Sequence, residues 1–137
     1  MANMIRAVDY FHVMVHDRPG EGYWIHSRLK QSGIRLLACC GFPTGGGRAQ
    51  LDLVPENPNA LLDWARQFEV TLSPRKWAFL IQGSDRPGVA ADIYEKLEHL
   101  GINVVATQAV CAGTGGWGMI LWVKPGDFER ASKALGI

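Results

Sequence analysis

The sequence predicts an α+β fold built from two copies of one small unit, each with the element order β-α-β-β-α-β. The main observation is a repeated turn, because His16-Asp17-Arg18-Pro19-Gly20 returns as Ser84-Asp85-Arg86-Pro87-Gly88. From position 17 to position 85 the offset is 68 residues, and the same offset relates Gly33-Ile34 to Gly101-Ile102. Strand periodicity before each turn and helical periodicity after it complete the pattern.

Each copy opens with a strand that runs into the turn. Phe11, Val13 and Val15 alternate with other residues at a period of two, which is typical of a half-buried strand. Trp77, Phe79 and Ile81 do the same in the second copy. The Asp-Arg-Pro-Gly turn then ends the strand, and its proline suits the first turn of a following helix, where its missing N–H is not needed.

A helix follows each turn. In the second copy the apolar residues recur at helical spacing, and they are Val89, Ile93, Leu97 and Leu100. Gly33 and Gly101 are typical of residues that end a helix in the left-handed conformation. The two helices are therefore expected to end just before these glycines.

The remaining elements complete each unit. We expect second strands at Ile34–Cys40 and Ile102–Cys111, and third strands at Gln50–Val54 and Met119–Val123, joined by glycine-rich links. A second helix is expected to begin near Asn59 in the first copy and near Asp127 in the second. The first copy has a closing strand at Glu69–Leu72, whereas that of the second copy is very short or missing.

Together these elements predict two ferredoxin-like units in tandem, at residues 7–72 and 75–137, each with two helices on one face of an antiparallel sheet. Proline and charge interrupt the apolar pattern at Ser73-Pro74-Arg75, which places the boundary there without a flexible linker. A unit this small buries too little surface to be stable alone, so we expect the copies to share burial and the chain to form a homodimer.

Composition excludes several classes of function. Fourteen basic and thirteen acidic residues give a net charge of +1, which does not indicate nucleic-acid binding. No apolar run suggests a signal peptide or a membrane span, so a cytoplasmic location is expected. The three cysteines, Cys39, Cys40 and Cys111, form no metal-binding pattern and are expected to be reduced, buried thiols. No metal or cofactor is predicted.

The order of strand, Asp-Arg-Pro-Gly turn, amphipathic helix, Gly-Ile-Asn and glycine hairpin resembles an ACT domain, and the chain resembles a tandem pair over nearly all of residues 7–137. The resemblance implies a ferredoxin-like fold that pairs side by side and binds a small ligand, typically an amino acid, at the interface between domains. The resemblance implies no catalytic activity of the domain itself. The regulated partner would then be a metabolic enzyme acted on in trans.

Carried over residue by residue, the resemblance places ligand contacts on the two turns and on the start of the second strand. In the second copy these residues are Asp85, Arg86, Pro87, Gly88, Val89 and Asn103. In the first copy they are Asp17, Arg18, Gly20 and Arg35. The family often carries asparagine at the turn acid, and Arg35 departs from the expected polar residue. We expect the turn and Asn103 to lie at the same end of the sheet, with a neighbouring unit closing the site.

Two functions remain open from the sequence alone. The first is a non-catalytic regulatory protein that binds a free amino acid through the helix N-termini, which suit a carboxylate. The alternative is a structural or interaction module that dimerises and binds no small molecule. His16 beside Asp17 brings no nucleophile with it, so an enzyme is not predicted.

Overall fold

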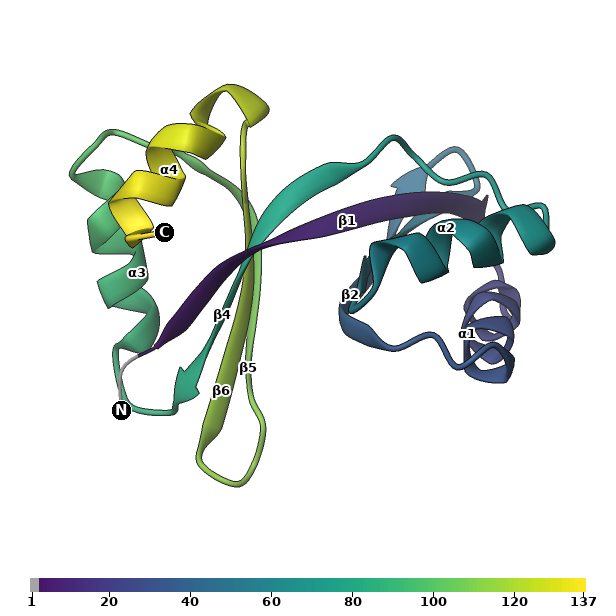
Figure 1. The fold of residues 1–137 in the computed structure, drawn as a ribbon, viewed down its shortest axis with the longest axis horizontal. Helices are drawn as coiled ribbons and strands as arrows, with labels where there is room; N and C mark the ends of the chain where they lie inside the picture. The colour runs from purple at the N-terminus through teal and green to yellow at the C-terminus, as the bar shows by residue number, and fades with distance from the viewer. Residues whose placement is uncertain (1–2) are drawn as a thin grey trace. The chain divides into compact units, whose positions relative to one another are not determined.

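A computed structural model describes residues 3–137 (Figure 1). Within this range the chain divides into two compact units. The first unit spans Asp9–Lys76, and the second combines residues 3–8 with Trp77–Ile137. The first strand, β1 (Met4–His16), therefore contributes its early residues to the second unit and its later residues to the first.

The first unit contains the end of β1, two further strands and two helices. The elements after β1 are α1 (Glu21–Gln31), β2 (Leu36–Gly45), β3 (Arg48–Pro55) and α2 (Pro58–Gln67). Strand β3 pairs antiparallel with β1 on one side and with β2 on the other.

The second unit repeats this plan. Strand β6 pairs antiparallel with both β4 and β5, and the start of β1 lies on the other side of β4. Its elements are β4 (Lys76–Ser84), α3 (Val89–Glu98), β5 (Val104–Cys111), β6 (Gly116–Val123), a single 3-10 turn (Pro125–Asp127) and α4 (Phe128–Leu135). The α+β class, the antiparallel sheets and the ferredoxin-like order predicted from the sequence are confirmed.

Each unit has its own apolar core between one sheet face and its helices. Phe11 and Val13 of β1 lie in the first core together with residues of both helices, including Ile25 of α1 and Leu61 and Trp64 of α2. Because alternate residues of a strand share a face, both helices must cover the same side of the sheet. The helices of this unit therefore lie on one face, as the sequence predicts.

The second core is organised in the same way. Phe79 and Ile81 pack with Ile93 and Leu97 of α3, and α4 lies beside α3 on the same side of the strands (Figure 1). Ile5, from the start of β1, packs against this cluster. Leu100 was expected on the buried face of α3, but it follows the end of the helix and is exposed.

The sequence repeat is reproduced in the backbone hydrogen bonds. The Asp17 N–H donates to the Gly47 carbonyl at 2.9 Å, and the Asp85 N–H donates to the Gly115 carbonyl at 2.8 Å. The bonds that end α1 and α3 also match, because the N–H groups of Ile34 and Ile102 each donate over 3.0 Å to the carbonyl five residues earlier. The offset of 68 residues is therefore a structural repeat.

The closing strand expected in the first unit is absent. Residues 69–72 form no strand, and this segment contacts β1 through the Ser73 N–H, which donates to the His12 carbonyl at 2.8 Å. Pro74 follows directly and has no N–H to continue a ladder. In the second unit no strand follows α4 within residues 3–137, and the start of β1 lies at the edge of β4.

Two smaller expectations also change. Helix α2 begins at Pro58, close to the expected position, but its cap is Asn57 and not Asn59, because the Asn57 side chain accepts a hydrogen bond from the Ala60 N–H. The thiols are not buried, since Cys39 and Cys111 are exposed and Cys40 is partly exposed. Among residues 3–137, no helix is long and apolar enough to cross a membrane.

Candidate functional site

The two Asp-Arg-Pro-Gly turns are the candidate ligand contacts that the sequence predicts. Each turn places a glycine just before its helix in the left-handed region, with φ of 95° at Gly20 and 80° at Gly88. Residues with a Cβ rarely adopt this conformation, so the turn requires glycine. Neither helix receives a hydrogen bond from a capping side chain, so the N-terminal N–H groups of both helices face outward without a side-chain cap.

The side chains of the second turn are already engaged. Arg86 pairs with Asp92 of α3. Asp85 accepts a hydrogen bond from the Cys111 thiol at the end of β5, and this bond is the main reason why the pKa of Cys111 is raised. Asp85 therefore points toward the β5–β6 hairpin and does not cap its own helix.

In the first turn the side chains take other partners. Arg18 lies 3.6 Å from a carboxylate oxygen of Glu21, and the same oxygen accepts a hydrogen bond from the His16 N–H at 3.3 Å. Glu21 thus pairs with the arginine of the first turn, as Asp92 does with the arginine of the second. The two turns have the same backbone, but they present different charged groups.

Asn103 does not lie beside the turn of its own unit. Strand β5 begins directly after Asn103 opposite Val123, and it ends at Cys111 beside the hairpin and the turn. At about 3.3 Å per residue, eight strand residues separate the two positions by roughly 25 Å. The expectation that Asp85 and Asn103 share one end of the sheet is therefore wrong, because the helix returns the chain to the opposite end before β5 begins.

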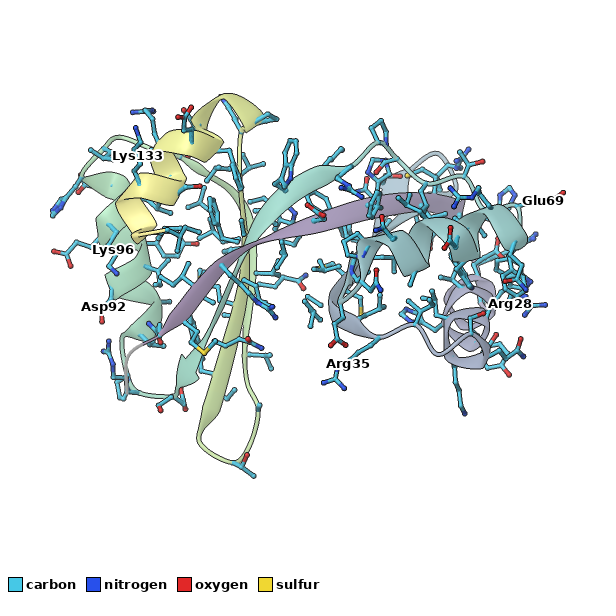
Figure 2. The ribbon with its side chains drawn as sticks, viewed as in Figure 1. Arg28, Arg35, Glu69, Asp92, Lys96 and Lys133 are labelled. Atoms are coloured by element: carbon cyan, nitrogen blue, oxygen red, sulfur yellow. The ribbon has the colours of Figure 1, made fainter. Side chains whose placement is uncertain are left out.

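Arg35 occupies the equivalent far position in the first unit. It lies just before β2, where its guanidinium is 3.3 Å from a carboxylate oxygen of Glu56 and its carbonyl accepts the Glu56 N–H. Figure 2 shows the side chain pointing away from the body of the unit. Arg35 thus closes the start of the β2–β3 hairpin, and it does not meet the Asp17 turn.

A groove of about 360 Å³ lies beside the first turn, within the first unit. Its lining includes His16 and Glu21, which flank the turn on either side, but none of the turn residues 17–20. The other lining residues come from β1, α1, β3 and the segment after α2, and they are Val13, Met14, Val15, Trp24, Ile25, Arg48, Glu69, Val70 and Thr71. The volume falls within the range of small-molecule sites.

Sequence reasoning did not identify this groove. Arg48 and Glu69, which give it charge, are far apart in the chain and belong to no motif. The one available signal is Pro74, which interrupts the expected closing strand. Pro74 lies where the edge of β1 is no longer paired with a strand.

A row of polar side chains crosses the other face of the first sheet. His12 of β1 is paired with Asp52 of β3, and Asp52 is paired with Cys40 of β2. Asp52 is 6% exposed and accepts a hydrogen bond from the Gln50 amide at 2.8 Å. Within residues 3–137 no cluster of three or more potential ligands could hold a metal ion.

The environment of this row shifts two pKa values. Burial raises the pKa of the Cys40 thiol to about 11, and the neighbouring Asp52 charge adds to the effect. Burial also lowers the pKa of His12, together with the Lys76 ammonium, whose nitrogen lies 3.4 Å from the imidazole. At neutral pH the thiol is therefore protonated and the imidazole is uncharged.

Fold and repeat together define a class of protein. The chain has a ferredoxin-like fold of two tandem ACT-type units, so the family resemblance seen in the sequence is confirmed at the level of the fold. No protein-family profile matches the sequence, and no curated protein matches it significantly.

Particular solved structures share this architecture over nearly their whole length. Protein BT0572 from Bacteroides thetaiotaomicron is 12% identical with a TM-score of 0.80, over 96% of this chain and 88% of that one. The regulatory subunit of aspartate kinase from Thermus thermophilus is 14% identical with a TM-score of 0.65, over 97% and 93%. The corresponding subunit from Thermus flavus is 18% identical with a TM-score of 0.55, over 98% and 93%.

Proposed function

We propose that this protein is a non-catalytic regulatory module that binds a free amino acid. The observation that carries the proposal is the pair of identical turns, each with a left-handed glycine before a helix that has no side-chain cap. Such a helix N-terminus favours a carboxylate, and the absent Cβ lets a ligand approach the backbone. The fold, which is shared with regulatory subunits of aspartate kinase, supports the same function.

The second turn is the proposed site for the amino acid. The N-terminus of α3 would receive the ligand carboxylate, and the Asp85 carboxylate would accept from its ammonium group. Arg86, Pro87, Gly88 and Val89 shape the turn around it. Because Asn103 lies roughly 25 Å from this turn in the same unit, it could contribute only to a ligand held by the turn of another unit.

The same residues argue against catalysis at the turn. The nearest nucleophile is the Cys111 thiol, and its hydrogen bond to Asp85 raises its pKa and lowers its reactivity. The regulated partner would then be a separate metabolic enzyme.

Calorimetric titration of the protein with the twenty amino acids tests the proposal. Asp85→Ala should weaken binding of the ligand by about 1.5–3 kcal/mol if a charged hydrogen bond is lost, which is roughly 10-fold to 150-fold in affinity. Asp17→Ala is the matched control, because it removes the same residue from the equivalent turn and should weaken binding less. If no amino acid binds at millimolar concentration, the proposal fails.

A structural or interaction module is the second candidate, and β5 favours it. This edge strand is mostly exposed, with Val105 at 55% and Val110 at 67%, and residues 102–123 contain no charged side chain. Natural edge strands usually carry charges that prevent pairing between sheets. We propose that β5 pairs two copies of the chain in a homodimer.

Light scattering distinguishes this candidate. Val110→Lys places a charge on the exposed edge and should convert a dimer into a monomer, whereas Thr114→Lys in the adjacent hairpin should not. A chain of 15.1 kDa that remains monomeric at high concentration in the absence of any substitution would refute the dimer.

A further inference from the structure

One edge of β1 is free in the first unit. The Asp17 N–H donates to the carbonyl of Gly47, which directly precedes β3, so the odd-numbered residues of β1 direct their backbone groups toward β3. The even-numbered residues direct their backbone groups to the opposite edge, where Ser73 forms hydrogen bonds with the backbone of His12. At Met14, in the part of the chain that the structure describes, neither the N–H nor the carbonyl on that edge has a partner.

Two local features leave this edge open. The Ser73 hydroxyl accepts a hydrogen bond from the His12 N–H at 2.9 Å, so a side chain takes the position of the carbonyl that a paired strand would supply. Pro74 next to it has no N–H. The segment from Glu69 to Thr71 therefore runs beside β1 without pairing, and the groove lies between them.

The second unit shows what occupies the equivalent place. At the offset of 68 residues, Val15 corresponds to Gly83 of β4. The side chain of Asn3 lies directly over Gly83, where a Cβ would also be 3.3 Å from the Asn3 Cα. There an extended segment, which continues into β1, lies against the edge of β4.

The groove offers three kinds of contact to such a segment. The Met14 backbone offers a donor and an acceptor at strand spacing. Ile25, which is buried, and Val15 provide an apolar floor. Arg48 is exposed at the start of β3 and forms no ion pair with any residue described, so it is available to a hydrogen-bond acceptor of the segment.

We propose that this groove binds an extended peptide segment of a partner protein. The segment adds to β1 as a strand, exchanges backbone hydrogen bonds with Met14 and inserts one apolar side chain beside Val15. Strand addition of this kind derives its affinity from the main chain and its specificity from alternate side chains. The site is separate from the Asp85 turn, and it does not depend on amino acid binding.

The test uses a fluorescein-labelled peptide with the sequence of residues 3–9, Asn-Met-Ile-Arg-Ala-Val-Asp, because residues 3–8 occupy the equivalent place in the second unit. Fluorescence polarisation with the full chain, free of amino acids, should give a dissociation constant of about 100 µM or lower. Thr71→Trp, which fills the groove from its exposed rim, should weaken binding at least about tenfold. Thr114→Trp, on the distant hairpin, is the matched control and should leave binding unchanged.

Two further measurements identify strand addition. Because a strand pairs through one edge, only one of two alternately N-methylated forms of the peptide should lose binding. Hydrogen exchange at the Met14 amide should be fast in the free protein and slow in the complex. The proposal is overturned if the peptide does not bind at roughly 1 mM, if both methylated forms bind equally, or if free leucine protects Met14 and the peptide does not.

Discussion

Glu69 should destabilise the first unit, because it adopts a left-handed conformation with φ of 54° at the end of α2. Its N–H donates to Arg66, and the next N–H donates to Ala65 at 2.8 Å. These are the two bonds of a Schellman motif, in which glycine is the preferred residue at this position. The second unit ends α4 with the same pair of bonds and has Gly136 there, with φ of 85°.

Glu69→Gly should therefore increase the free energy of unfolding. A residue with a Cβ costs about 1–2 kcal/mol in the left-handed region, and the greater flexibility of unfolded glycine offsets about 0.5–1 kcal/mol of the gain. The net stabilisation is about 0.5–1 kcal/mol, or about 2–4 °C in the melting temperature. Urea unfolding followed by circular dichroism measures it, with Gly136→Glu as the control of opposite sign. A lower stability of Glu69→Gly would refute this account of the turn.

Two further predictions follow from the polar row of the first unit. With a pKa of about 11 against an ordinary 9.0, the Cys40 thiol should react with iodoacetamide at pH 8 about 100-fold more slowly than a simple thiol, as followed by peptide mass spectrometry. Equal rates would contradict the buried environment. The lowered pKa of His12 means that the unfolded chain binds a proton more readily, so stability should fall as the pH decreases below 6.5. His12→Gln should reduce this fall in urea titrations at pH 7 and pH 5, and an unchanged slope would contradict it.

Local signals made much of the fold predictable. The turn residues and the apolar spacing of Ile93 and Leu97 depend on neighbours within one or two helical turns, and the elements they predict are present. The position of Asn103 was misplaced for a different reason. Its sequence neighbours indicate the start of a strand, but only the direction of the preceding helix shows at which end of the sheet that strand begins.

The edges of the sheets could not be predicted in this way. The segment from Met4 to Val8 carries no strong strand pattern, and its partner β4 lies some seventy residues further along the chain. Likewise, the groove arises because Pro74 and the turn at Glu69 keep one segment from pairing, while Val15 stands where the second unit has glycine. Whether a sheet edge is paired depends on which backbone groups form hydrogen bonds, and residue types alone do not predict this.

The division of β1 between the two units has a consequence for biosynthesis. Residues 3–8 leave the ribosome before the rest of both units, yet the core against which Ile5 packs includes Leu135 of α4. The first unit can fold once residue 76 has been synthesised. The second unit needs α4 before residues 3–8 can pack against a complete core. Such long-range contacts slow folding. Until α4 has been synthesised, residues 3–8 are an unpaired segment that a chaperone would need to shield.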